Sequence, residues 1–517
     1  MHLTKILTGW TYPKRVIVLI SVLSVTRAII SSIPELGTDE SYYWTYSHFL
    51  QWNYFDHPPM IAIWIKLFTG NLWLEQYAWC LRLGSIAGCA ISTWFMYKCV
   101  SLLSNERAGW FAACLYNASF YAGITAGLFI LPDSPQMVFW TFSLWMIARI
   151  SIDDRKWLSW ILFGIGSGLC IMSKAHGIFI WFGLGFFIVF NKRSWLKNPR
   201  LYAALILALA ISSPILVWNI QNDFVTFRFH SRRVDVIGYS IHWFRLLREI
   251  IGQPCINNPF NVILIVSALS AWLWHQMRHT AALSIYNYIS LPLALLILFI
   301  SVFRDTLPHW SGPAYITLIP LAAIRLASVN KASVFPNQLR WSLGLYIVFL
   351  IVCTCMFRFY PGNLGVSTKK ELGKGDISLD NYGWDEAGKK FAVIYQDEIN
   401  KGIMLPGSPL ICNKWWGAHE EYYFCRASDI QMIGLGSMND LHEYMWMNKM
   451  RKDKVNFSTA YCIVHSDENY NVYTQYENFY SKIDTAAIID VPRNKKPSHN
   501  FYIFRLSGWK NRLPMER

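Results

Sequence analysis

The sequence is poor in charge for its length. Only 15% of its 517 residues are charged, against about 25% in a typical soluble protein. Acidic side chains are the scarcer kind, with 32 Asp and Glu against 47 Lys and Arg. Hydrophobic residues make up 54% and aromatic residues 16%, which excludes a disordered chain. The length also excludes a small disulfide-rich protein, although there are 11 cysteines.

Several motifs are absent as well. No phosphate-binding loop or dinucleotide-binding fingerprint occurs, so we expect no nucleotide cofactor. The cysteine spacing does not suggest zinc, and most cysteines fall within apolar runs, where they act as small apolar side chains. One disulfide, Cys412 to Cys425, would fit an oxidising compartment. No convincing internal repeat is present, which disfavours the duplicated folds of many transporters.

The positive charge is concentrated in the apolar part of the chain. Residues 1–358 hold 27 Lys and Arg against 13 Asp and Glu, whereas residues 359–517 hold 20 against 19. A basic soluble protein would suggest nucleic acid. Basic residues set among apolar runs instead indicate loops sorted across a membrane, or an anionic lipid ligand. We therefore expect membrane lipids as partners and no nucleic acid.

Eleven apolar runs are long enough to cross a bilayer as helices. They cover residues 15–33, 78–102, 109–130, 135–151, 157–173, 176–191, 201–219, 259–275, 281–303, 312–328 and 340–358. The short apolar stretch 58–74 is predicted to be a re-entrant or interfacial helix, so the expected number of membrane helices is about 11–13.

The remaining tail is polar enough to be soluble. Residues 384–399 have the period of an amphipathic helix, and four short apolar runs indicate strands. These strands are expected at residues 409–413, 460–466, 486–491 and 501–506. The prediction is an α-helical polytopic membrane domain over 1–358 and a small soluble α/β domain over 359–517.

Lys and Arg in short loops predict the orientation. Basic residues such as Lys14, Arg155 and Lys192 fall on one side if the spans alternate, and that side is expected to be the cytoplasm. The N-terminus is then cytoplasmic. The loops 34–77, 131–134, 220–258 and 304–311 and the polar tail are then on the outer face.

Ionisable residues gather in these outer loops, where they suggest function. The first loop carries Asp39 and Glu40, then Asp56 and His57, and the next short turn carries Asp133. Each has a plainer interpretation, because an acidic residue at such a place often caps a helix or is simply solvated. Capping and solvation explain several acidic sites on one face of the membrane less well than they explain a single one, so together these sites favour a function.

A third outer loop is rich in arginine and has no lysine. It contains five arginines, namely Arg228, Arg232, Arg233, Arg245 and Arg248, and it also has His230 in the run FRFHSRR. Pairing with loop carboxylates and lipid headgroups would also explain them. Lys174, near the outer end of its span, adds a cation at the same depth, although a lysine at a helix end can simply reach toward water.

Transfer from a phosphorylated lipid would use all of these groups. The planar guanidinium group of arginine can bind two phosphate oxygens at once. A carboxylate can take the proton from an acceptor hydroxyl or amine. A second carboxylate with a histidine could hold a divalent metal that offsets the charge of the leaving group.

Longer motifs give the chain a recognisable resemblance. The loop TDESYYWTYSHFLQWNYFDHPPM is similar to the first outer loop of the GT-C glycosyltransferases of the protein-mannosyltransferase and aminoarabinose-transferase superfamily. The resemblance continues through LPDSPQMVFW, IMSKAHGIFIW and HWSGPAY, and reaches the tail in CNKWWGAHEEYYF, as in a bacterial branch. It implies a GT-C membrane fold with a soluble C-terminal domain.

The resemblance also implies roles for single residues. Asp39 would be the catalytic base that activates the acceptor, with Glu40 as the alternative carboxylate. Asp133 would orient the acceptor or the base. Lys174 matches the family lysine that contacts the carrier phosphate. His57 stands where the aminoarabinose branch has a lysine, so it is assigned either to the donor phosphate or to a metal.

The arginine-rich loop matches the family stretch that supplies a metal-binding histidine and phosphate-binding arginines, to within a residue or two. Arg228, Arg232 and Arg233 are therefore expected at the donor phosphate. Asp56 and His230 are expected as ligands of a divalent metal, Mg²⁺, Mn²⁺ or Zn²⁺. His419 and His442 in the tail could touch the acceptor, although ordinary packing explains them as well.

Proteins of this family take a sugar from a polyprenyl-phosphate carrier and transfer it, on the outer face, to a lipid or protein acceptor. The resemblance thus implies an inverting hexosyl- or pentosyltransferase of the bacterial cytoplasmic membrane that acts on a cell-envelope lipid, glycan or protein. The alternative is a transporter or a flippase for lipid-linked sugars. A transporter should hold its ionisable residues near the bilayer midplane, so their clustering in outer loops favours the enzyme.

Overall fold

The chain folds into two compact units. The computed structural model describes residues 9–238, 240–274, 281–331, 333–451, 455–468 and 471–510. One unit, called the helical unit below, combines Met1–Ser31 with Leu50–Ile351. The other, called the C-terminal unit, combines Val352–Arg517 with the distant segment Ser32–Phe49.

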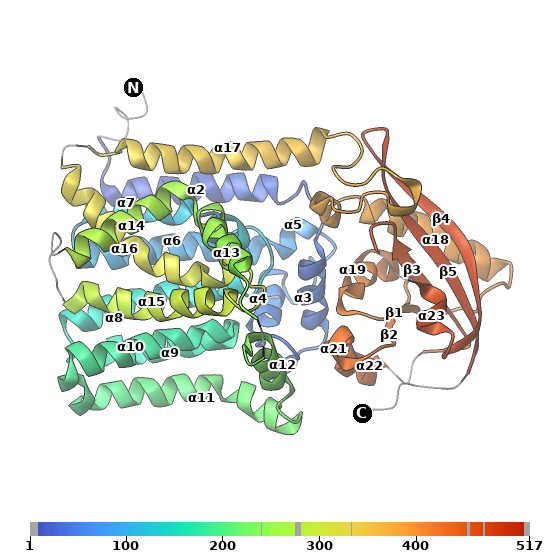
Figure 1. Ribbon diagram of the computed structural model, residues 1–517, viewed down its shortest axis with the longest axis horizontal. Coiled ribbons are helices and arrows are strands. Elements are labelled where there is room, and N and C mark those ends of the chain that lie inside the picture. Colours follow the sequence, from blue (N-terminus) through green and yellow to red (C-terminus); the bar gives the residue numbers. More distant parts are fainter. Residues whose placement is uncertain are drawn as a thin grey trace. The chain divides into compact units, whose positions relative to one another are not determined.

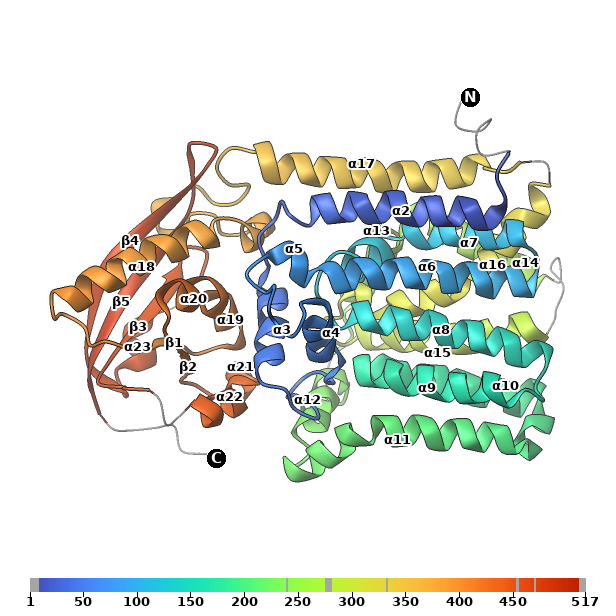
Figure 2. The same cartoon turned by 180° about the vertical axis from the view of Figure 1, so that it is seen from behind.

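The helical unit consists of helices whose long members lie side by side (Figures 1 and 2). They are α2 (Tyr12–Ile30), α4 (Met60–Phe68), α5 (Ala78–Leu81), α6 (Leu83–Leu103), α7 (Glu106–Ala118), η1 (Tyr121–Thr125), α8 (Asp133–Ile152), α9 (Trp157–Ser173), η2 (Ala175–Gly177), α10 (Ile178–Asn191), η3 (Arg193–Lys197), α11 (Pro199–Gln221), α12 (Val225–Val234), α13 (Trp243–Asn257), α14 (Pro259–Leu273), α15 (Ala281–Ser301), η4 (Pro308–Ser311), α16 (Gly312–Val329) and α17 (Asn337–Phe359).

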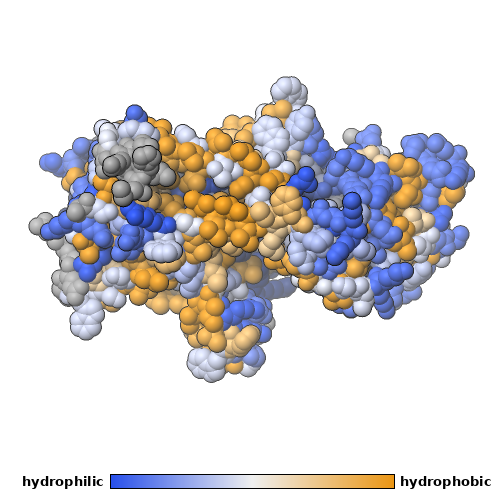
Figure 3. Space-filling model, turned by 90° about the horizontal axis from the view of Figure 1, so that it is seen from above, coloured by the Kyte–Doolittle hydropathy of each residue, from blue (hydrophilic) through white to orange (hydrophobic). Residues whose placement is uncertain are grey.

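One continuous apolar core joins these helices. Trp140 of α8 is fully buried in it, and its indole nitrogen donates to Thr317 Oγ1 of α16 at 2.8 Å. Other large apolar side chains face outward, including Val25 of α2 and Trp341 of α17. Figure 3 shows such side chains gathered over the middle of the helices. Apolar residues exposed in a continuous belt are suited to lipid rather than to water.

Ten of the eleven predicted apolar runs coincide with helices over most of their length, and the fold class of a multi-pass helical membrane protein is confirmed. Five of the described helical segments are long and apolar enough to cross a bilayer, or six if α13 and α14, which meet at 106°, form one bent span. Helices α9 and α10 are shorter apolar helices. Residue 275 of the expected run 259–275 lies outside the described residues.

One predicted span is interrupted. The run 109–130 was expected to be a single helix, but α7 ends at Ala118 and the π-helical turn η1 follows. A buried arginine accounts for the break, because Arg27 of α2 donates to the carbonyl of Gly123 at 2.9 Å and to Asn117 Oδ1 at 3.1 Å. Tyr346 of α17 shares the same carbonyl at 3.1 Å. The irregular turn thus supplies acceptors for a buried cation.

The arginine-rich segment 220–258 also differs from expectation, because it is mostly helical. Helix α12 carries the run FRFHSRR, and α13 follows it as an amphipathic helix. The stretch 58–74 contains the short apolar helix α4, as its composition predicts. These helices place polar side chains at one end of the long helices, where the candidate site lies.

The C-terminal unit is a small α/β structure, as its sequence predicts. Its further elements are α3 (Thr38–His48), η5 (Lys369–Glu371), η6 (Ile377–Asn381), α18 (Trp384–Asn400), β1 (Leu410–Cys412), η7 (Trp415–Gly417), α19 (Ala418–Glu420), η8 (Glu421–Cys425), α20 (Arg426–Ser428), β2 (Met432–Gly434), α21 (Met438–Leu441), α22 (Tyr444–Arg451), β3 (Thr459–His465), α23 (Val472–Tyr476), β4 (Tyr480–Arg493) and β5 (Lys496–Trp509).

The five strands form one mixed sheet in the order β2-β1-β3-β5-β4. β1 is parallel to β2 and β3, whereas β5 is antiparallel to β3 and β4. The four expected strands and the amphipathic helix α18 are all present. The short strand β2 was not predicted.

All 11 cysteines are free. The disulfide considered between Cys412 and Cys425 is therefore not formed. Cys425 is buried, and Cys412 is partly buried at the end of β1. Both act as small side chains in the packing of the C-terminal unit.

Candidate active site

A buried ion pair joins two of the predicted site residues. Asp133 is the first residue of α8, and Lys174 directly follows α9. The ammonium of Lys174 lies 2.9 Å and 2.8 Å from the two carboxylate oxygens of Asp133. Both side chains are almost fully buried, with 9% and 3% exposed. The lysine is thus held by a carboxylate rather than reaching toward water.

Tyr121 of η1 holds the same carboxylate from another side, since its hydroxyl donates to Asp133 Oδ1 at 2.7 Å. Asp133 therefore has a fixed orientation at the start of α8, where the helix dipole also favours a negative charge. A lysine ammonium has three hydrogens. At least one hydrogen of Lys174 remains for a further acceptor such as a phosphate oxygen.

The loop that carries Asp56 and His57 is docked on the α11–α12 segment. Asn53 Nδ2 donates to Thr226 Oγ1 at 2.9 Å, and Thr226 Oγ1 donates to the carbonyl of Tyr54 at 3.0 Å. Next to these bonds, His230 Nε2 lies 2.9 Å from the main-chain oxygen of Asp56. The structure therefore brings Asp56, His57 and His230 together, although 174 residues separate the two bonded positions.

His57 shares an electrostatic environment with the ion pair. Burial lowers the pKa of His57 to about 4, and the charges of Asp56, Lys174, His230 and Asp133 all act on it. Burial also lowers the pKa of His230. At neutral pH both rings are therefore uncharged, so His57 could contact an anion only as a hydrogen-bond donor and not as a cation.

Helix α12 separates the predicted arginines. His230 and Arg233 are three residues apart and share a face of the helix, whereas Arg228 and Arg232 share the opposite face. The guanidinium of Arg233 lies 5.0 Å from the ring of Trp310, and its charge acts on His230. Among the described residues, no hydrogen bond or ion pair joins the side chains of Arg228 or Arg232 to this cluster.

Three ionisable residues near the cluster were not singled out from the sequence. The charges of Lys174 and Asp133 act on both His176 and His309. Tyr121 contacts Asp133 directly. The two histidines stand within the motifs IMSKAHG and HWSGPAY. Because these motifs already carried the family resemblance, their histidines could have been predicted as site residues from the sequence.

A complete metal site is not visible in the described part of the chain. No group of three or more His, Cys, Asp and Glu side chains there is placed to hold a metal ion. The Nε2 atom of His230, expected as a ligand, instead contacts the main-chain oxygen of Asp56. The assignment of Asp56 and His230 to a divalent metal therefore stays a prediction.

The two carboxylates at the start of α3 belong to the C-terminal unit and differ in their surroundings. Glu40 is buried, and its carboxylate accepts the backbone N–H of Gly37 at 3.1 Å, which caps the helix. Asp39 is exposed. A capping carboxylate has a structural task, so the surroundings favour Asp39 over Glu40 as the reactive group.

His419 and His442 take part in the packing of the C-terminal unit. The ring of His419 stacks on Trp384 at 3.7 Å, and its Nε2 lies 2.8 Å from the carbonyl of Leu36. His442 stacks on Trp415 at 5.9 Å. Both histidines are buried. His419 therefore attaches the segment before α3 to the rest of the unit.

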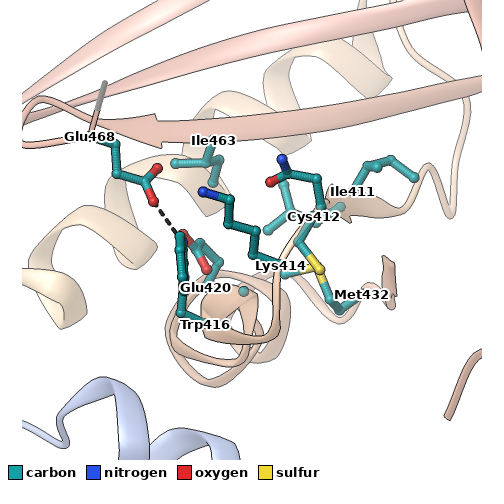
Figure 4. Close-up of a pocket in the computed structure, with 11 residues that line it drawn as sticks. Ile411, Cys412, Lys414, Trp416, Glu420, Met432, Ile463 and Glu468 are labelled. Carbon is teal, nitrogen blue, oxygen red and sulfur yellow. Dashed lines mark hydrogen bonds between the residues drawn. The ribbon is translucent and has the colours of Figure 1, made fainter. Parts of the chain in front are cut away.

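A small cavity lies beside β1 in the same unit (Figure 4). Lys414, Trp416, Glu420 and Glu468 point into it, and the indole nitrogen of Trp416 donates to Glu468 at 2.6 Å. Burial raises the pKa of Glu420 well above its usual range. The volume of about 20 Å³ is enough for a single water molecule, so the cavity is too small for a sugar or a lipid.

Comparison with known proteins places this geometry in context. The family model described as dolichyl-phosphate-mannose-protein mannosyltransferase matches residues 56–218, which include Asp56, His57, Asp133 and Lys174. The chain is 23% identical over 360 residues to the lipid A galacturonosyltransferase RgtD of Rhizobium johnstonii. That match covers 66% of this chain and 71% of the relative.

Two solved structures share the fold over almost the whole chain. Both are ArnT from Cupriavidus metallidurans, one in the apo state and one bound to undecaprenyl phosphate. The TM-scores are 0.61 and 0.62, with 13% and 14% sequence identity. The matches cover 95% and 94% of this chain, and 98% and 97% of the solved chains. At this identity the likeness establishes the fold.

Proposed function

We propose that this chain, which is a GT-C glycosyltransferase of the protein-mannosyltransferase and aminoarabinose-transferase type, moves a sugar from a polyprenyl-phosphate carrier to a lipid of the bacterial cell envelope. The binding of undecaprenyl phosphate by ArnT supports the donor class. The acceptor named in RgtD, lipid A, supports a glycolipid acceptor. The reaction would take place on the outer face of the cytoplasmic membrane.

The buried pair of Lys174 and Asp133 is the observation that carries the proposal. A buried lysine held by one carboxylate has a fixed position and a spare hydrogen, so it can bind an anion without a large loss of side-chain entropy. His57 and His230 lie in the same electrostatic environment. This arrangement suits a phosphate that leaves with increasing negative charge.

Arg233 is proposed as the second cation for the phosphate. It stands on the same face of α12 as His230, and Trp310 supports its guanidinium. A guanidinium can bind two phosphate oxygens at once. Lys174 would then hold the bridging side of the leaving group and Arg233 its outer oxygens.

Asp39 is proposed as the base. An acceptor hydroxyl attacks the anomeric carbon on the face opposite the phosphate, and the bond between that carbon and the phosphate oxygen breaks. The acceptor proton passes to Asp39, and the carrier leaves as polyprenyl phosphate. One displacement inverts the anomeric configuration. The exposure of Asp39 on α3 and the structural task of Glu40 support this choice.

The test is transfer by three variants in membranes supplied with polyprenyl-phosphate sugars. We expect Asp39→Asn to lower the rate by at least about 100-fold, since a general base contributes about 10²–10⁴-fold. Glu40→Gln should keep most of the activity. Asp385→Asn, an exposed aspartate in the first turn of α18, is the matched control and should not change the rate.

Mass spectrometry of the envelope lipids identifies the product. A lipid that lacks one sugar in a deletion strain, and regains it with the wild-type chain but not with Asp39→Asn, would support the assignment. Normal transfer by well-expressed Asp39→Asn would exclude Asp39 as the base. A sugar missing only from proteins would contradict the lipid acceptor.

A further inference from the structure

The C-terminal unit contains a larger cavity that the proposed transfer reaction does not use. Its volume is about 180 Å³, about nine times that of the cavity beside β1. The wall includes three carboxylates, two histidines and a tryptophan, which are Asp376, Asp380, Asp467, His465, His499 and Trp384. We call it the His499 pocket. Its size suits one monosaccharide ring, and its wall also includes the apolar side chains of Ile377 and Leu379.

His499 presents an unused acceptor at this wall. The side chain is 3% exposed, and its Nε2 has no hydrogen-bond partner in the protein. Its Nδ1 lies 3.1 Å from Ser498 Oγ, and that hydroxyl already donates to the carbonyl of Val491 at 2.7 Å. Ser498 Oγ must therefore accept the hydrogen on Nδ1, which leaves a lone pair on Nε2. Burial lowers the pKa of His499 to about 3, so the ring is neutral.

The donors at the wall are already used inside the protein. The indole nitrogen of Trp384 donates to the carbonyl of Leu379 at 3.0 Å. The hydroxyl of Thr38 donates to Asp380, and His465 Nδ1 contacts Asp467. The wall thus offers acceptors to an incoming molecule, and that molecule must supply the hydrogens.

The charge of the wall is negative. Asp376 is balanced by Arg493, 3.0 Å away. Asp380 and Asp467 remain 45% and 35% exposed, and within the described ranges of the chain each forms an ion-pair contact only with a histidine. A ligand with a carboxylate or phosphate would be repelled here, whereas hydroxyl and ammonium groups would be favoured.

From this geometry we infer that the His499 pocket binds a single neutral or amino-bearing sugar ring, with a hydroxyl or ammonium group donating to His499 Nε2, and that it excludes anionic sugars. A metal ion is a poor alternative occupant, since no group of three His, Cys, Asp and Glu side chains in the described residues is placed to bind one. The inference concerns binding alone and does not depend on the transfer reaction.

The experiment is saturation-transfer NMR on the full-length protein in detergent, with methyl glucoside, methyl glucosaminide and methyl glucuronide as probes. We expect binding of the first two and none of the third. His499→Phe keeps a planar ring but loses the acceptor, so it should weaken binding of both sugars about tenfold. His499→Gln keeps an acceptor and should stay within about threefold of the wild type.

A second variant tests the inference without changing the buried ring of His499. Asp467→Asn should reduce the preference for the amino sugar over methyl glucoside, whereas Asp484→Asn, on exposed β4, should leave it unchanged. Binding of methyl glucuronide as strong as that of methyl glucoside would overturn the inference. So would unchanged binding in folded His499→Phe. If His499→Phe does not fold, an unchanged preference in Asp467→Asn overturns it.

Discussion

Lys174 and Asp133 meet across 41 residues of sequence and have two tasks. As a buried pair they stabilise the ends of α8 and α9, because either charge alone would be costly in a dry environment. As a fixed cation, Lys174 is available to a phosphate. Under the proposed function, stability and donor binding are therefore coupled at this position, and mutations must separate them.

A double-mutant cycle separates the two tasks. Lys174→Met or Asp133→Asn alone leaves one buried charge without its partner, which costs about 3–5 kcal/mol and should lower the melting temperature by several degrees. The double variant should recover at least half of that loss but remain inactive. Thermal unfolding in detergent measures the first effect and sugar transfer the second. Lys98→Met, an exposed lysine on α6, is the control.

This interpretation would fail if the double variant were less stable than either single variant. It would also fail if the double variant transferred sugar at the wild-type rate, because the phosphate would then need neither group.

The arginines of α12 provide a second prediction at the scale of single residues. Arg233→Ala should raise the KM for the polyprenyl-phosphate donor about tenfold, since a hydrogen bond to a charged group contributes about 1.5–3 kcal/mol. Arg232→Ala, on the opposite face of the helix, should change it less than twofold. Equal effects of the two variants would show that the face of α12 does not decide which arginine binds phosphate.

At the scale of elements, the attachment of α3 is the most informative feature. The loop before α3 binds α18 and η6 through Glu35, whose carboxylate accepts the backbone N–H of Trp384 at 2.7 Å. Asn381 donates to the carbonyl of Glu35 at 2.9 Å. Burial, together with the charges of Asp385 and Glu386, raises the pKa of Glu35 to about 7. The carboxyl is therefore protonated in mildly acidic solution.

A pH dependence follows from this shift. Between the ordinary pKa of 4.5 and about 7, the folded chain holds a proton on Glu35 that the unfolded chain has lost. Stability from this group should therefore fall as pH rises from 5 to 7 and stay low above it. Glu35→Gln should remove this slope, measured as melting temperature against pH.

Glu477→Gln, an exposed carboxylate in the same unit, should leave the slope unchanged. A melting temperature that falls from pH 5 to 7 as steeply in Glu35→Gln as in the wild type would contradict a role for Glu35.

At the scale of the whole molecule, the chain order and the folding units do not coincide. The segment that carries Asp39 leaves the helical unit at Ser31 and returns at Leu50. Its aromatic residues pack on the C-terminal unit, with Tyr42 against Trp415 and Trp44 against Tyr422, each at 5.0 Å. The proposed base is thus supported by residues near the end of the chain.

Truncation tests this dependence. A chain that ends at Phe359 removes the partners of Tyr42 and Trp44, so residues 32–49 should become at least about tenfold more sensitive to protease, since locally unpacked segments open more often. The bond network around Asn53 and Thr226 lies within the helical unit and should stay protected. Limited proteolysis with mass spectrometry measures both. Equal protection of 32–49 in the two chains would contradict the assignment of α3 to the C-terminal unit.

The sequence by itself determined the membrane class, the helical runs, most of the strands and the family resemblance. These depend on local composition, on periodicity and on motifs within a few dozen residues, all of which can be read along the chain. The sequence also identified Asp133 and Lys174 as separate candidates.

Only the tertiary structure decided which candidates meet. It paired Lys174 with Asp133, set Arg233 apart from Arg228 and Arg232, and broke the run 109–130 where Arg27 needed an acceptor. It also placed residues 32–49 with partners more than 300 positions away. Ion pairs, buried hydrogen bonds and packing depend on distance in space, and a linear pattern carries no record of that distance.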